Sequence, residues 1–356
     1  MNLAVQYISG MIGCAMLLSL TTSCDVHEFP DEPDEAAVCL KLHFATNMPQ
    51  WEYPVTESRT YVPSRDVQTD GYMRYIIRLY PGTSDSRSLS SRAEHEHEFI
   101  FTRSVADGYD AEFVLDDIPT GEYTLMAWAD LIEKEGEIPL YNAENFAQVK
   151  LQTDEHQGCN DYRDAFRGTL DLTIKPGIVV RGYENATVEM ERPMAKFEFT
   201  TTDLDEFIDK EILAAISRGE TTHEAIANAP SKSWDMSKYK IMFYYIGFMP
   251  TTFNMFTDRP SDSTTGVAFP GRFMRLEGNE ASLGFDYVFV NHIEAKVAVQ
   301  IGIFDDEGNR LSLTSPIDVP LHRSEHTLIK GKFMLQNASG GVGIDPSFSG
   351  EHNIFI

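Results

Sequence analysis

The sequence predicts a mainly β protein with two tandem β-sandwich domains and one helix in the second domain. Many short segments alternate apolar and polar residues, which is typical of strands with one buried face. Clusters of Pro, Gly, Asn and Asp separate these segments at modest spacing, as in β-sandwiches. The length of 356 residues suits two domains rather than one.

The first domain is expected over residues 37–193. Its opening strand has one apolar face, formed by Val38, Leu40, Leu42 and Phe44. The same alternation predicts further strands at residues 72–80, 97–102, 111–115, 122–128, 146–151, 167–174 and 186–191. Polar segments at 55–70 and 82–94 are expected to be loops after the first and second strands.

The second domain is expected over residues 194–356. Strands are predicted at residues 196–201, 240–248, 266–269, 284–290, 295–304, 317–321 and 327–335, with a hairpin turn at 305–309. Phe197 and Phe199 share a strand face and should both enter the core. A helix is predicted at about 204–217, because Asp203 and Glu206 have the spacing of a capping box and Gly219 follows the last apolar residue.

The N-terminus resembles a bacterial lipoprotein signal. An apolar stretch too short to span a bilayer ends in small residues before Cys24. Residues 1–23 are therefore predicted to be a signal peptide, with Cys24 as the lipidated residue and Cys14 as the alternative acceptor. Residues 24–36 are acidic and interrupted by Pro, which predicts a tether. Buried acyl chains contribute about 0.8 kcal/mol per CH2, so several chains on one cysteine would anchor the protein.

The composition argues against nucleic-acid binding. With 55 acidic and 29 basic residues, the formal net charge is −26, which repels phosphate backbones. After removal of the signal, Cys39 and Cys159 remain. They lack zinc-ligand spacing, and whether they form a disulfide stays open.

The sequence offers no site for catalysis, and the protein is predicted not to be an enzyme. It contains neither a Gly-x-Ser-x-Gly elbow nor a phosphate-binding loop. His95 and His97 would face the same way on a strand, but two ligands are too few for a metal site. No cofactor is therefore predicted. Trp51 and Trp234 are candidate platforms for stacking on sugars, which leaves a surface glycan-binding lipoprotein as the alternative function.

Three stretches resemble one family. Residues 118–128, with the turn Pro119-Thr120-Gly121, are similar to the turn-and-strand signature of transthyretin-like sandwiches. Residues 191–199 resemble the junction at which the second sandwich begins in fimbrillin-like proteins of Bacteroidota. Residues 317–323 and 327–333 are similar to the paired C-terminal strands of the same proteins.

This resemblance implies two transthyretin-like sandwiches and a cell-surface lipoprotein of type V fimbriae, acting as an anchor, accessory or structural subunit. Its partners would be other fimbrial subunits, the outer membrane through the acyl chains, and surface ligands of the host or of bacteria. Acidic residues soon after the lipidated cysteine, as at Asp25 and Glu28, resemble the signal for export to the outer face of that membrane.

The resemblance also implies assembly by strand donation. In shaft subunits of this family an arginine-specific protease removes the first strand, and a strand from a neighbour refills the groove. The candidate processing sites here lie in the two predicted loops and are Arg59, Arg65, Arg87 and Arg92. The short sequence after residue 335 argues against donation of a C-terminal strand and favours an anchor or accessory subunit.

Overall fold

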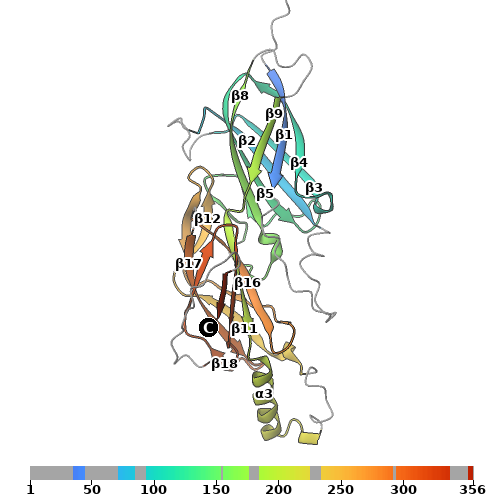
Figure 1. Ribbon diagram of the computed structural model, residues 1–356, viewed down its shortest axis with the longest axis vertical. Coiled ribbons are helices and arrows are strands. Elements are labelled where there is room, and N and C mark those ends of the chain that lie inside the picture. The colour runs from blue at the N-terminus through green and yellow to red at the C-terminus, as the bar shows by residue number, and fades with distance from the viewer. Residues whose placement is uncertain are drawn as a thin grey trace, which may run out of the picture.

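Two β-sandwiches follow one another along the long axis of the molecule (Figure 1). The structure, a computed structural model, describes residues 35–44, 71–84, 94–153, 155–175, 184–224, 234–291, 294–336 and 352–355. The helix α3 (Leu204–Arg218) projects from the far end of the second sandwich. This arrangement confirms the predicted fold of two tandem β-sandwiches.

The first sandwich consists of two sheets with the strand orders β4-β1-β9 and β3-β2-β5-β8. Its strands are β1 (Glu35–Phe44), β2 (Tyr72–Pro81), β3 (His97–Ser104), β4 (Ala111–Pro119), β5 (Gly121–Ile132), β8 (Ala165–Ile174) and β9 (Glu184–Met190). Each was predicted from alternation. However, β1 begins at Glu35, so it includes the last two residues of the segment that was predicted to be a tether.

The apolar faces of both sheets form one core. The core-facing side chains of β1 are at most 5% exposed, and they are joined by Tyr123, Leu125 and Ala127 of β5. The predicted turn before β5 is stabilised by a hydrogen bond that the Tyr123 hydroxyl donates to the Pro119 carbonyl at 3.1 Å. The alternation of the sequence therefore identified the core face of β1, whereas β5 is buried on both faces from Tyr123 onward.

The second sandwich has the sheet orders β15-β16-β10-β20-β21 and β14-β11-β17-β18, with β19 also paired to β17. Its strands are β10 (Met194–Thr201), β11 (Lys240–Tyr245), β14 (Ala268–Pro270), β15 (Met274–Arg275), β16 (Ala281–Phe289), β17 (Glu294–Phe304), β18 (Arg310–Leu313), β19 (Ile317–His322), β20 (His326–Gly331) and β21 (His352–Phe355). The predicted hairpin turn lies between β17 and β18, whereas β20 ends at Gly331, earlier than predicted.

The two sandwiches share one topology. In the first, β1 lies between antiparallel β4 and parallel β9; in the second, β10 lies between antiparallel β16 and parallel β20. The opposite sheets correspond as well, because β2 pairs with β3 and β5 just as β11 pairs with β14 and β17. The C-terminal strand β21 adds to the β20 edge in parallel. Thus β1 and β10 occupy equivalent central positions.

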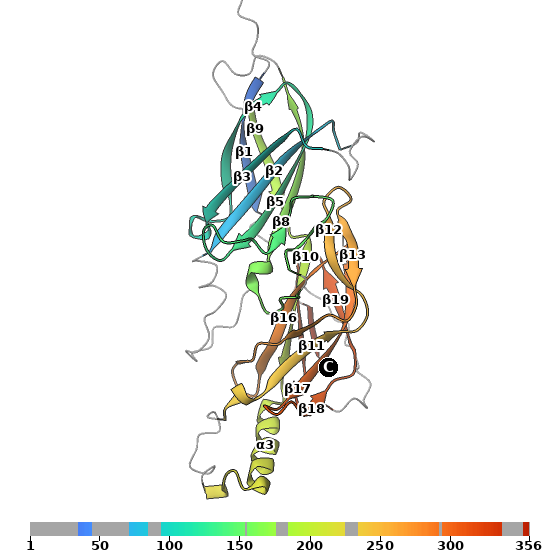
Figure 2. The same cartoon turned by 180° about the vertical axis from the view of Figure 1, so that it is seen from behind.

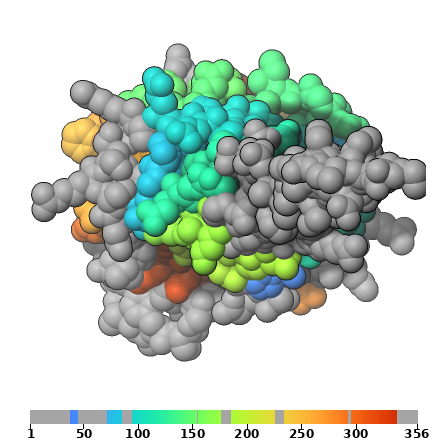
Figure 3. Space-filling model, turned by 90° about the horizontal axis from the view of Figure 1, so that it is seen from above, coloured from blue at the N-terminus to red at the C-terminus, as the bar shows by residue number. Residues whose placement is uncertain are grey.

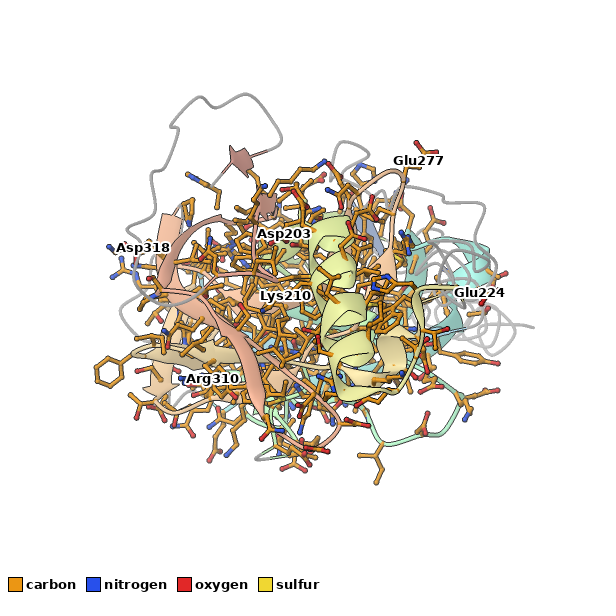
Figure 4. All side chains as sticks on the ribbon, turned by 90° about the horizontal axis from the view of Figure 1, so that it is seen from below. Asp203, Lys210, Glu224, Glu277, Arg310 and Asp318 are labelled. Carbon is orange, nitrogen blue, oxygen red and sulfur yellow. The ribbon has the colours of Figure 1, made fainter. Side chains whose placement is uncertain are left out.

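The helix α3 and its N-cap residue Asp203 were predicted correctly, but the predicted capping hydrogen bond is not formed. It ends at Gly219, which adopts a left-handed φ of 76°. Asp203 makes no side-chain hydrogen bond to the helix. Its carboxylate instead accepts hydrogen bonds from the backbone N–H groups of Met334 and Leu335, at 3.2 and 3.0 Å. Asp203 therefore fixes the chain that follows β20 rather than capping α3, and Figure 4 shows it at the start of the helix.

A third sheet joins the two halves of the chain, with the order β13-β12-β7-β6. Its strands are β6 (Tyr141–Asn142), β7 (Val149–Leu151), β12 (Met249–Asn254) and β13 (Arg259–Thr264). The hairpin of β12 and β13 stands at the level between the sandwiches (Figure 2). It was not predicted, because its Pro, Ser, Thr and Asp residues are typical of turns. Short 3-10 helices lie at Val105–Asp107 (η1), Asp161–Arg163 (η2) and Met236–Lys238 (η5).

Phe199→Ala is expected to destabilise the second sandwich. Phe197 and Phe199 of β10 are both 0% exposed and lie in its core, as predicted. Truncating a buried Phe to Ala typically costs about 3–5 kcal/mol, so the melting temperature should fall clearly. Phe248→Ala is the matched control, since Phe248 is 74% exposed and should change stability by less than about 0.5 kcal/mol. Equal melting temperatures for the two variants would contradict this assignment of the core.

Candidate functional site

The strand β1 has the properties of a strand that a neighbour could replace. It pairs along its length with β4 on one side and β9 on the other, with Leu40 opposite Phe113 and Ala186. Seen from the end of the first sandwich, a small part of β1 (blue) is visible beside β9 (yellow-green) in Figure 3. Without β1, both neighbours would expose unpaired backbone groups above an apolar floor. Such a groove accepts an extended segment.

Asp110 holds the C-terminal end of β1. Its carboxylate accepts a hydrogen bond from the Phe44 N–H at 2.8 Å, and its other oxygen lies 2.9 Å from Nδ1 of His43. Burial opposes ionisation of Asp110, but these hydrogen bonds outweigh it and lower its pKa below the ordinary value. The end of β1 is thus fixed by polar contacts and its middle by apolar ones.

The predicted site residues lie outside the described residues. These are Cys24, Arg59, Arg65, Arg87 and Arg92, together with Trp51. Their positions between strands are nevertheless fixed by chain order. Arg59 and Arg65 fall between β1 and β2, whereas Arg87 and Arg92 fall between β2 and β3.

The two candidate cleavage loops differ in what a cut would release. A cut after Arg59 or Arg65 would separate β1 alone from the rest of the sandwich. A cut after Arg87 or Arg92 would also separate β2, which is paired along its length with β3 and β5. Only the first loop therefore permits removal of β1 with the opposite sheet left covalently whole.

Both cysteines that were considered as a pair are free thiols. Cys39 is half-buried in β1. Cys159 precedes β8 but contacts β16 of the second sandwich, where its Sγ accepts a hydrogen bond from the Phe285 N–H at 3.4 Å. Burial raises the pKa of Cys159 to about 12. This thiol is therefore protonated at neutral pH and is a poor nucleophile.

Two further searches of the described part of the chain gave negative results. No cluster of three or more His, Cys, Asp or Glu residues there is arranged to hold a metal ion. Within the same ranges, no helix is long and apolar enough to cross a membrane.

Trp234 is not an open platform for a sugar. It is half-buried against the second core, and its Nε1 donates a hydrogen bond to the Tyr239 hydroxyl at 3.1 Å. Nζ of Lys238 lies 5.2 Å from the centre of the indole ring, so one face of the ring is covered. Trp128 is 0% exposed and lies in the cluster between the sandwiches.

A buried network of charges joins the sandwiches around Asp286 of β16. Arg163 of η2 forms an ion pair with this carboxylate. His156 Nε2 and the Tyr245 hydroxyl lie 2.6 Å from its other oxygen. Burial by itself would raise the pKa of Asp286, but Arg163, His156 and Tyr245 outweigh it and lower the pKa below its ordinary value. Asp286 is therefore an ionised group at the centre of the junction.

Two more ion pairs connect the segment around η2 to the start of the second sandwich. Arg192 binds both oxygens of Asp164, with two N–O distances of 2.8 Å. Lys196 Nζ lies 3.0 Å from Asp161 and 4.1 Å from the ring centre of Phe285. Both basic residues belong to the stretch 191–199 that resembles the fimbrillin junction, so the structure gives that stretch a physical role.

Sequence reasoning missed the acidic half of this junction. The signal was present as Asp161-Tyr162-Arg163-Asp164, a dense run of charges after a polar segment. Such a run is usually a solvated turn, and only its contacts with β10 and β16 show that it is buried.

Comparison with known proteins places the whole described chain in one family. No curated protein has a similar sequence. One similar solved structure is the fimbrial anchor protein Mfa2 from Porphyromonas gingivalis, with 11% identity over 78% of this chain and 82% of that chain and a TM-score of 0.40. Another is a fimbrial assembly protein from Parabacteroides distasonis, with 11% identity over 86% of this chain and 93% of that chain and a TM-score of 0.36. Both come from Bacteroidota, the group of the fimbrillin-like proteins that the sequence resembles. Residues 33–355 match the family described as "Family of unknown function (DUF6562)", and the chain belongs to that family.

Proposed function

We propose that this protein is a non-enzymatic subunit of a fimbrial assembly, held at the outer face of the outer membrane by acyl chains on Cys24. The observation that carries the proposal is the position of β1. It is the first strand after the acidic tether, it lies between two partner strands, and it fills the core of the first sandwich. A strand in this position links the lipid anchor directly to a groove suited to strand exchange.

We further propose that the two sandwiches correspond to domains at residues 37–193 and 194–356. The strand β9 ends at Met190 and β10 begins at Met194, so little chain separates them. The shared topology of the two sandwiches supports this division. The sheet of β6, β7, β12 and β13 draws strands from both proposed domains and would keep them in one orientation.

An anchor or accessory role is favoured over a shaft role. The C-terminal strand β21 pairs with β20 of its own chain, with Thr327 opposite His352. A strand that is occupied in this way is less available to a neighbour. Residues 342–348, which also follow β20 in the chain, lie outside the described residues. An anchor must also keep β1, because losing it would cut the protein from its lipid.

If this chain is instead a shaft subunit, we propose that a protease cuts it after Arg59 or Arg65. A cut at either residue would release β1 and leave β2 in its sheet, whereas a cut at Arg87 or Arg92 would release both strands. The two roles therefore differ in the mass of the protein recovered from cells.

Intact mass spectrometry of the protein purified from its own cells is expected to give an acylated chain that begins at Cys24 and is not cut at Arg59 or Arg65. Cys24→Ala should leave an uncleaved precursor or release the protein from membranes, because no other lipid attachment is proposed. Cys14→Ala is the matched control and should behave as wild type.

Other results would assign other roles. A shortened chain without acyl groups, found in heat-stable oligomers, would indicate a shaft subunit. A processed Cys24→Ala protein that still fractionates with membranes would contradict the proposed anchor. A full-length monomer that crosslinks to no fimbrial partner and binds glycans, with binding lost in Trp51→Ala or Trp234→Ala, would favour the alternative of a glycan-binding lipoprotein.

A further inference from the structure

A cleft of about 450 Å³ lies beside the junction and is lined by residues of β7, β12 and β13 together with His156 and Arg163. Its volume lies within the range of roughly 300–1,000 Å³ that is typical of small-molecule sites. Its floor is buried and its rim is exposed. The lining residues that matter chemically are Lys150, His156, Arg163, Thr252, Ser261 and Asp262.

The floor contains a buried donor without an acceptor. The side chain of Arg163 is 5% exposed, and its two terminal nitrogens are bound to Asp286 and to the Tyr287 carbonyl. Its Nε is buried and has no hydrogen-bond partner in the part of the chain that is described. Buried donors are almost always paired, so this N–H is a position where an acceptor of a bound molecule would be stabilised.

The rim adds a positive charge and hydroxyl groups. Lys150 is exposed and forms no ion pair with any residue of known placement. On the adjacent strand Thr252 lies directly opposite Lys150, and its hydroxyl accepts a hydrogen bond from the Ser261 hydroxyl at 3.1 Å. Asp286 balances the charge of Arg163, so Lys150 supplies the positive charge of the lining. The overall field of a chain with a net charge of −26 repels anions. An anion that binds here must be held by these local groups.

Asp262 decides what kind of anion fits. Its carboxylate lies on the same rim and would repel a dianion such as phosphate. It can, however, accept hydrogen bonds from the hydroxyl groups of a ligand that carries a single negative charge elsewhere. Lys150 and Asp262 flank Thr252 in register on its two neighbouring strands, so a molecule with one carboxylate and several hydroxyls can contact both.

We propose that this cleft binds a carboxylated sugar residue, such as a uronic acid. The carboxylate lies toward Lys150 and the free N–H of Arg163, and the sugar hydroxyls bond to Asp262, Thr252 and Ser261. This inference does not depend on the proposed fimbrial role, because it concerns a ligand bound at the junction and not assembly through β1.

The test is a titration of methyl glucuronide into the full mature chain. Calorimetry or ligand-observed NMR measures the binding. Methyl glucoside is the uncharged match of the glucuronide. The glucuronide should bind, and the glucoside should bind at least about tenfold more weakly, as expected for loss of a charge-assisted hydrogen bond. Lys150→Ala should weaken glucuronide binding by a similar factor. Lys296→Ala should leave it unchanged, because Lys296 pairs with Asp318 on an exposed strand face away from the cleft.

Arg163→Lys keeps the charge but removes the Nε–H, and it should also weaken binding where a thermal melt shows that the variant is folded. If it does not fold, Ser261→Ala at the exposed rim provides the second test. The proposal is overturned if glucuronide does not bind, if Lys150→Ala and Ser261→Ala bind it as wild type does, or if inorganic phosphate competes as strongly as the glucuronide.

Discussion

A chain that begins at residue 45, and so lacks β1, is expected to lose the cooperative unfolding of its first sandwich. Four side chains of β1 point into that core, and each is at most 5% exposed. Burying one such side chain contributes about 1.5–3 kcal/mol, so four contribute roughly 6–12 kcal/mol. This is comparable to the entire stability of a typical domain, which is about 5–15 kcal/mol. Differential scanning calorimetry of the two chains provides the measurement.

Addition of a synthetic peptide with the sequence of residues 35–44 should restore the lost transition, because the peptide can pair with β4 and β9 and refill the groove. A control peptide with Leu40→Asp and Leu42→Asp should not restore it, since both positions are 0% exposed in the intact protein. If the truncated chain melts like wild type, β1 does not complete the core. If both peptides restore the transition equally, the groove does not select the side chains of β1.

Asp286→Ala is expected to lower the free energy of unfolding by about 3–5 kcal/mol, because it leaves a buried guanidinium without its carboxylate. Arg163 is 5% exposed and would remain at the junction as an uncompensated charge. Tyr245 and His156 would lose their acceptor at the same time. Chemical denaturation with fluorescence or circular dichroism provides the value.

Asp318→Ala is the matched control for that experiment. Asp318 pairs with Lys296 at 3.1 Å, but both side chains are more than half exposed, so removing it should cost less than about 1 kcal/mol. The double variant Arg163→Met with Asp286→Leu should be more stable than Asp286→Ala alone, since it leaves no unpaired charge. Equal stability of Asp286→Ala and Asp318→Ala would mean that the pair does not hold the junction.

Strands and the helix could be predicted because their signals are local. The alternation in β1 assigns Val38 and Leu40 to the core without reference to any partner, and the spacing of apolar residues in α3 does the same. The start of α3 was predicted correctly but for the wrong reason. Asp203 has the spacing of a cap, yet its carboxylate binds backbone groups far along the chain at Met334 and Leu335.

The sequence by itself determined the class of fold, the order of most strands, the buried face of β1 and the resemblance at residues 191–199. Only the tertiary structure decided how the sandwiches join. The hairpin of β12 and β13 has a polar sequence, and its strands pair with each other and with β7 of the first half. Likewise Arg163 and Asp286 are 123 residues apart, and nothing in either local sequence indicates burial. Alternation reports which face of an element is apolar, whereas pairing between distant polar segments depends on which surfaces the folded chain brings together.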